Sequence, residues 1–237
     1  MTNLQAQQLP LDLVTQEPPT FENLVAGPNR EAVDALRRFA VGEVSETSIV
    51  VWGAPGAGKT HLLHAAVAAA HEARRRAHYV AQPAELDAES CSTLSLLCVD
   101  AVDSADSAAQ SRLFTLYNAL AASSGRLVVA AAAAPARLAL RDDLRTRLAH
   151  GLVYEIVNLP DADKAHALDA YARERGFRLS SDVINYLFTH GRRDMVTLVS
   201  MLAALDRHSL SVKRPVTVPL LRDWIRRQTA PHRGEKT

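Results

Sequence analysis

The sequence predicts an α/β protein in which a parallel five-stranded sheet carries a phosphate-binding loop and precedes a small helical lid domain. Three observations support this prediction. Residues 53–60 read Gly-Ala-Pro-Gly-Ala-Gly-Lys-Thr, which matches the phosphate-loop pattern G-x-x-x-x-G-K-[ST]. Short apolar runs alternate with helical patterns up to residue 159, as they do in parallel sheets. After Pro160 the pattern is helical only.

The core segments follow one another as strand and helix. Each expected strand is a short apolar run; these strands span residues 48–52, 77–81, 94–99, 126–131 and 153–157. The expected helices begin at about Glu31 and then cover residues 61–76, 110–123 and 137–148. The stretch 83–93 reads as a short connection.

The domain boundary is predicted at Pro160. Residues 20–159 form the expected nucleotide-binding core and residues 160–228 the lid, with helices over 161–175, 181–190, 194–208 and 219–227. Gly176 should end the first lid helix, and Ser180 or Ser181 should cap the second. We expect a flexible polar tail over residues 1–19 and a disordered end over residues 229–237.

Composition argues against several classes of protein. The 237 residues include 27 Lys and Arg and 26 Asp and Glu, so a net charge of +1 gives no general field for membranes or for sequence-specific DNA binding. The first 30 residues hold no signal-peptide core, and no apolar run reaches 18 residues. Cys91 and Cys98 are typical of reduced core cysteines. We therefore expect a cytoplasmic protein.

The phosphate loop predicts a nucleotide site for ADP or ATP with Mg²⁺. Lys59 reaches the β- and γ-phosphate oxygens in such loops, and the Thr60 hydroxyl binds the metal. Asp100 ends an apolar strand, where a carboxylate would hold Mg²⁺ through its water shell; the alternative is an ordinary strand-ending Asp. The backbone cradle comprises Gly53, Ala54, Pro55, Gly56, Ala57 and Gly58.

The groups that hydrolyse a nucleotide in the same chain are missing from the sequence pattern. A carboxylate that orients water usually follows the metal Asp, but Ala101 stands there and Asp103 comes only two residues later. The tip of the next strand, near the γ-phosphate, reads Ala131 to Ala134. We therefore expect weak intrinsic hydrolysis.

Two arginines and one N-terminal segment each have two interpretations. Arg147 and Arg193 lie where an arginine could stabilise phosphate charge, but each could be a solvated helix residue. Residues Gln8 to Leu13 read Gln-Leu-Pro-Leu-Asp-Leu. Alternating leucines suit an extended peptide in a groove, although an ordinary tail would also look like this.

Several motifs together resemble the AAA+ ATPase family, specifically its DnaA branch, over roughly residues 8–227. The phosphate loop is common to many families. More specific are the stretches Thr20 to Val25, Leu116-Tyr117-Asn118, Arg147 to Leu152 and Arg193-Asp194-Met195. The third matches the arginine-finger box S-R-[FL]-x-x-G, and the fourth matches the lid sensor R-E-[LM]. The stretch 83–93 is shorter than the usual connection of this family, so the comparison implies that a core helix is missing.

The resemblance implies roles for individual residues. Phe21 and Val25 belong to the adenine-side box, Arg193 would be the sensor 2 arginine, and Arg147 would be an arginine finger acting in trans. The segment with Gln8, Leu9, Leu11 and Leu13 resembles the hexapeptide that binds the sliding clamp, the β subunit of DNA polymerase III.

The resemblance is strongest to the regulators of this branch, because DnaA continues into a DNA-binding domain and this sequence stops at the lid. Such regulators bind ADP, dock on the DNA-loaded clamp and stimulate hydrolysis of the ATP held by DnaA, which prevents re-initiation of replication. An autonomous ATPase, either a DnaA-like motor or a helicase loader, is the alternative, and a binding module with structural nucleotide is a third. A second copy of the chain is a further candidate partner.

Overall fold

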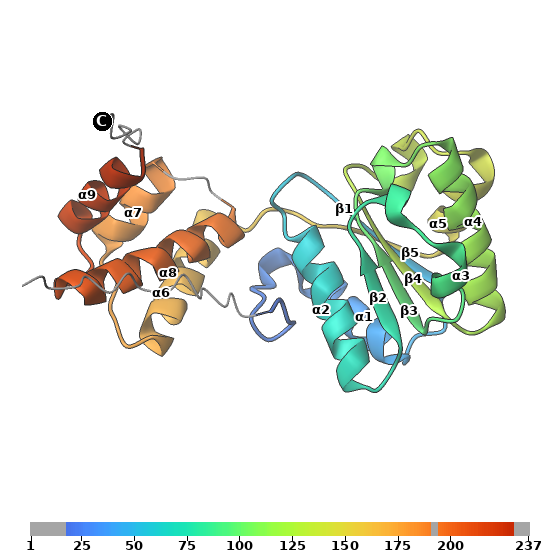
Figure 1. Ribbon diagram of the computed structural model, residues 1–237, viewed down its shortest axis with the longest axis horizontal. Helices are drawn as coiled ribbons and strands as arrows, with labels where there is room; N and C mark the ends of the chain where they lie inside the picture. The colour runs from blue at the N-terminus through green and yellow to red at the C-terminus, as the bar shows by residue number, and fades with distance from the viewer. Residues whose placement is uncertain (1–17, 191–193, 230–237) are drawn as a thin grey trace, which may run out of the picture.

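The computed structural model describes residues 18–190 and 194–229 (Figure 1). Its centre is a five-stranded parallel sheet in the order β2-β3-β4-β1-β5, which confirms the predicted fold class. The strands are β1 (Ser48–Trp52), β2 (Ala77–Val80), β3 (Leu96–Val99), β4 (Arg126–Ala131) and β5 (Leu152–Glu155).

Helices cover both faces of the sheet, because alternate residues of each strand point to opposite sides. On β1, Ile49 and Val51 pack toward one layer, whereas Val50 packs toward the other. The first layer holds α1 (Arg30–Val41) and α2 (Lys59–Glu72). The second holds α3 (Ala88–Cys91), α4 (Ser107–Ala122) and α5 (Asp142–His150). Short 3₁₀ helices span Gly27–Asn29, Pro83–Glu85, Val102–Ser104 and Pro135–Arg137.

Two connections differ from the expectation. The stretch 83–93 does contain a helix, α3, but it is only one turn long and is capped by the Asp87 side chain. The helix expected from Arg137 begins instead at Asp142. Leu138 and Leu140 are both buried and alternate into the core, and the Arg141 N–H donates to Gln110 Oε1 at 2.8 Å. An extended backbone thus buries both leucines and pairs the Arg141 N–H, so the helix begins only after this stretch.

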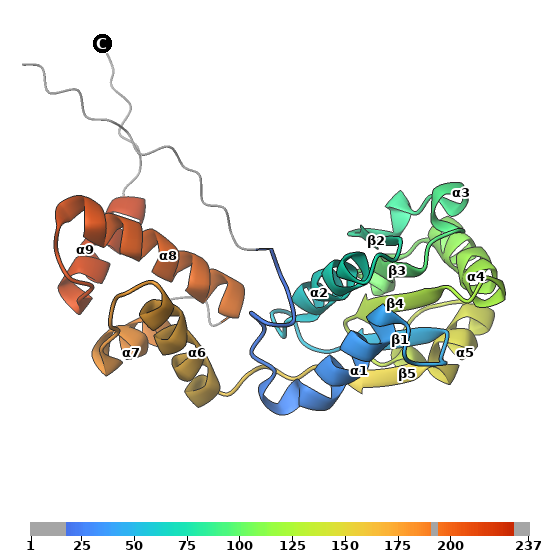
Figure 2. The same cartoon turned by 90° about the horizontal axis from the view of Figure 1, so that it is seen from below.

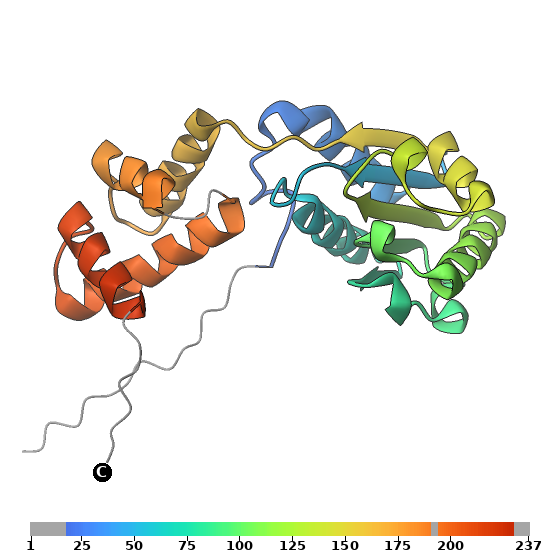
Figure 3. The same ribbon diagram turned by 90° about the horizontal axis from the view of Figure 1, so that it is seen from above.

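The lid is a separate helical lobe with its own apolar core (Figures 2 and 3). Gly176, at φ +81°, ends the first helix as expected: its N–H donates to Arg173 O and the next N–H to Ala172 O. Asp194 caps the third helix by accepting the Thr197 N–H at 2.9 Å. The helices are α6 (Asp161–Glu174), α7 (Ser181–His190), α8 (Met195–Val212) and α9 (Val218–Thr229).

A side-chain clasp joins the segment before α1 to the junction between core and lid. The amide of Asn29 donates to Val157 O and accepts from Val157 N–H, both at 2.9 Å. Gly27, at φ +50°, lies so close to Leu159 that an added Cβ would approach its side chain to 2.5 Å. None of the helices in the described ranges is long and apolar enough to cross a membrane.

Candidate nucleotide-binding site

The phosphate loop lies between β1 and α2, at the carboxyl edge of the sheet. Gly56 and Gly58 adopt φ +77° and +101°, which a side chain would strain, so the glycines permit the inward turn of the backbone. Gly53 is fixed from two strands, since its N–H donates to Ala131 O at 3.3 Å and an added Cβ would meet Ile156 O at 2.1 Å. The loop thus has the backbone conformation that an anion cradle needs, and the assignment of its residues to nucleotide binding stays a prediction.

The Lys59 ammonium folds back over this loop. Its Nζ donates to the carbonyls of Gly53 at 2.7 Å and Ala54 at 3.0 Å. Burial lowers the pKa of Lys59 below its ordinary value, and the carboxylates of Asp100 and Asp103 offset part of that shift. The cation is therefore held at the cradle by neutral carbonyls that an entering phosphate can replace.

Thr60 and Asp100, the two residues expected at the metal, are brought together. The Thr60 hydroxyl donates to Asp100 Oδ2 at 2.6 Å, and the Tyr79 hydroxyl donates to the same oxygen at 3.1 Å. Burial, together with the Asp100 carboxylate, raises the pKa of Tyr79 to about 12. A hydroxyl, a carboxylate and nearby phosphates are a donor set that suits Mg²⁺, which takes few protein ligands. Tyr79 lies on β2 without a motif that would have singled it out from the sequence.

Asp103 bonds the backbone at the tip of β4, where the alanine run has no polar side chain. Its Oδ1 accepts the Ala132 N–H at 2.9 Å, across the gap that the alanine run leaves beside the loop. Ala101, at the position expected for the water-orienting carboxylate, takes the left-handed conformation with φ +49°. Its N–H donates to the Asp100 side chain. The Asp103 carboxylate at the alanine tip is thus engaged by a backbone N–H.

The lid contributes one wall of a cleft of about 660 Å³. Helix α8 begins over the phosphate loop, where a Cβ on Gly56 would lie 3.1 Å from Asp194 Cβ. Helix α6 adds its first turn on the same side. The lining residues are Pro55, Gly56, Asn158, Asp161, Lys164, Asp194 and Thr197. This cleft joins the loop to the lid, as nucleotide binding between them requires.

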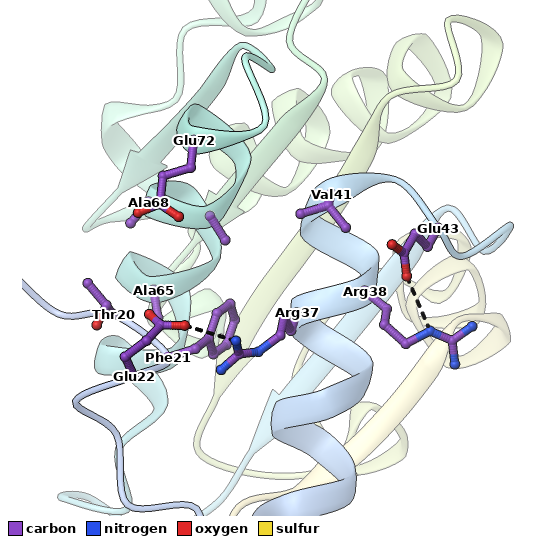
Figure 4. Close-up of a pocket in the computed structure, with 11 residues that line it drawn as sticks. Thr20, Phe21, Glu22, Arg37, Arg38, Val41, Glu43, Ala65, Ala68 and Glu72 are labelled. Carbon is purple, nitrogen blue, oxygen red and sulfur yellow. Dashed lines mark hydrogen bonds and ion pairs between the residues drawn. The ribbon is translucent and has the colours of Figure 1, made fainter.

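Phe21 lies elsewhere. It is buried and lines a second pocket of about 280 Å³ between α1 and α2 (Figure 4). Arg37 lies 5.2 Å from the Phe21 ring centroid and donates to Glu22 at 2.8 Å. Val25 is half-buried in the segment that follows. Phe21 is therefore not among the residues that line the cleft at the phosphate loop, and the assignment of Phe21 and Val25 to adenine binding stays a prediction.

Arg147 is exposed in the last turn of α5. Its guanidinium carbon lies 5.7 Å from the ring centroid of the buried Tyr117 on α4. Its neighbours are paired: Arg145 bonds Asp142 at 2.5 Å and Arg141 bonds Asp143 at 2.7 Å. No carboxylate of the described residues pairs with Arg147.

Two further predictions lie outside the described residues. These are the N-terminal segment with Gln8, Leu9, Leu11 and Leu13, and the lid arginine Arg193. Arg193 directly precedes Asp194, the residue that lies against Gly56.

Two family models match separate parts of the chain. The bacterial DnaA ATPase domain matches residues 15–90, which include the stretch Thr20 to Val25 and the phosphate loop. The lid domain of Hda matches residues 161–225, which are nearly the whole helical lobe.

Solved structures share the fold at low identity. Domain III of the Thermotoga maritima replication initiation protein DnaA is 22% identical with a TM-score of 0.72, over 87% of this chain and 96% of that one. AMPPCP-bound DnaA from Aquifex aeolicus is 22% identical with a TM-score of 0.65, over 82% of this chain and 69% of that one. The Thermotoga maritima RuvB Holliday junction branch migration motor is 15% identical with a TM-score of 0.64, over 87% and 70%. This chain thus has an AAA+ fold in which residues 15–90 match the bacterial DnaA ATPase domain and the helical lobe matches the lid domain of Hda.

Proposed function

We propose that this protein is a nucleotide-bound regulator of DnaA, which docks on the sliding clamp and supplies Arg147 to the ATP held by DnaA. The observation that carries the proposal is the state of Arg147: it is exposed, and no ion pair with a described residue engages it, whereas the arginines beside it on α5 and at its start are paired. An arginine finger must offer its charge to another molecule. Arg147 meets that requirement.

The place of Arg147 in the fold supports action in trans. The phosphate loop follows the carboxyl end of β1, whereas α5 returns to the amino end of the sheet, where Gly151 packs against Ser48, the first residue of β1. Five residues of β1 separate the two edges. At a strand rise of about 3.3 Å per residue the two edges lie roughly 15 Å apart, and Arg147, four helical residues before Gly151, lies nearer the amino edge than the edge that carries the loop. The Tyr117 ring supports the guanidinium from one side, as in cation–π pairs.

The nucleotide itself is proposed as ADP with Mg²⁺. The related DnaA from Aquifex aeolicus carries AMPPCP, an ATP analogue, and the loop, Lys59, Thr60 and Asp100 of this chain offer a matching site. Lack of a carboxylate at Ala101 favours retention of the product over turnover. The regulator would work in the cytoplasm, where DnaA acts on the chromosome.

We predict that the purified chain alone hydrolyses ATP very slowly, because Ala101 cannot orient water and the alanine tip of β4 cannot hold it. General-base catalysis is worth about 10²–10⁴ in rate. Steady-state release of phosphate from ATP measures this. Turnover at the rate of a working motor, with or without DNA, would favour the alternative of an autonomous DnaA-like or helicase-loader ATPase.

The N-terminal segment is the proposed clamp ligand, and it supplies the experiment that tests the function. The full chain should stimulate hydrolysis of DnaA-bound ATP only when clamp is loaded on DNA. Deletion of residues 8–13, or Leu11→Ala with Leu13→Ala, should abolish clamp binding and stimulation because two apolar anchors are lost. ADP affinity of the deletion variant should equal that of the full chain. Stimulation that persists without the segment, or without clamp, would contradict this part of the proposal.

A further inference from the structure

Lys164 is a buried cation at the phosphate loop that no motif identifies. It is the one charged residue buried in the described chain, and only 10% of its side chain is exposed. It lies in the first turn of α6 and lines the cleft that Pro55 and Gly56 of the phosphate loop also line. Its placement therefore links the lid to the residues that cradle the phosphates.

The surroundings of Lys164 compensate its charge only in part. A positive charge in the first turn of a helix faces the positive end of the helix dipole, and burial removes its water. Among the described residues its ion-pair partner is Asp161, whose Oδ1 lies 3.6 Å from the ammonium and whose side chain is half exposed. This distance is long for a charge-assisted hydrogen bond, which is usually about 2.7–2.9 Å. The site would be better satisfied by an additional anion in the cleft.

We propose that Lys164 is a lid ligand for the phosphate groups of the bound nucleotide, and that Asp161 holds its ammonium in place until the nucleotide enters. The inference rests on the proposed nucleotide binding. It assigns the lid two contacts with one ligand, from the first turn of α6 and from the start of α8, which already lies against Gly56. Binding of phosphate would then draw both helices toward the loop.

The test compares three lid variants for ADP affinity by isothermal titration calorimetry. Lys164→Met keeps the apolar stem and removes the charge. One charge-assisted hydrogen bond is worth about 1.5–3 kcal/mol, so ADP should bind roughly 10- to 100-fold more weakly. Lys213→Met, at the other lysine of the described lid and an exposed one, should bind ADP normally. Asp161→Asn should bind ADP as well as the unchanged chain or more tightly, because the competing carboxylate is neutralised.

The outcomes separate this inference from the proposed function. If Lys164→Met binds ADP normally, the inference is wrong, although nucleotide binding stands. If Asp161→Asn loses affinity as Lys164→Met does, the pair is a structural ion pair and the inference is also wrong. If Lys164→Met does not fold, Asp161→Asn alone decides: unchanged or tighter ADP binding supports the inference, and a loss of affinity overturns it. If the unchanged chain binds no ADP, the proposed function itself fails.

Discussion

The Arg147→Ala variant should fold, bind ADP and bind clamp, yet fail to stimulate hydrolysis of DnaA-bound ATP. Arginine fingers supplied in trans are worth about 10³–10⁵ in rate, so stimulation should fall by roughly 10³-fold or more, to the rate of DnaA alone. The physical reason is that a guanidinium at the γ-phosphate stabilises charge that develops in the transition state. Single-turnover hydrolysis of DnaA-bound ATP, with loaded clamp and saturating regulator, measures the effect.

Arg145→Ala is the matched control. Arg145 lies on the same helix, but its guanidinium is engaged by Asp142 within the chain, and an exposed pair of this kind contributes little to stability. It should stimulate hydrolysis normally. Equal loss in both variants would mean that α5 is a general docking surface, and normal activity of Arg147→Ala would remove the finger assignment altogether.

Lys59→Ala should lose most of its affinity for ADP. The ammonium now bonds two loop carbonyls and would exchange them for phosphate oxygens. Charge-assisted bonds of about 1.5–3 kcal/mol each imply a loss of roughly 100-fold or more when the cation makes two of them. Calorimetric titration gives the constant. Thermal unfolding gives a second readout, because ADP at 100 times Kd stabilises a native state by about 2.7 kcal/mol.

Arg193→Ala is the comparison for Arg147→Ala and for Lys59→Ala. If Arg193 closes the lid on the nucleotide of its own chain, its loss should weaken ADP binding first and stimulation only as a consequence. Arg147→Ala should show the reverse order. If Arg147→Ala loses ADP affinity and Arg193→Ala does not, the assignment of Arg147 to the partner's ATP and of Arg193 to the chain's own nucleotide is wrong. Unchanged ADP affinity in Lys59→Ala would move the nucleotide site away from the phosphate loop.

Local patterns predicted those parts of the site that one contiguous segment builds. The strand before the phosphate loop follows from its apolar run, and the loop follows from the conformations open to its glycines. Asp100 is singled out because it ends another apolar run. All of these are properties of neighbouring residues. Lys164, Tyr79 and Asp103 could not be found in this way. Each is an ordinary residue in its own segment. Only the folded sheet and lid bring Tyr79 to Asp100, Asp103 to Ala132 and Lys164 to the cleft beside Gly56.

The start of α5 shows the same limit from another side. Basic and apolar residues from Arg137 onward suit a helix. Leu138 and Leu140 are instead both buried in the core, in an extended segment that precedes the helix. Tertiary burial overrides local preference in such cases, because the helical alternative would leave apolar surface in water. The boundary therefore depends on contacts with α4 that a single segment does not reveal.

The clasp between Asn29 and Val157 has a consequence for how the protein is made. It joins residues 128 positions apart, and β1 is completed only by β4 and β5, which come late in the chain. Contacts between residues so far apart in sequence form slowly during folding, because the chain loses loop-closure entropy before the contacts stabilise it. On the ribosome the phosphate loop is thus synthesised early, but the strands that pair with β1 on either side, β4 and β5, are synthesised later. Until β5 emerges, the nascent chain carries the binding motif without the binding site.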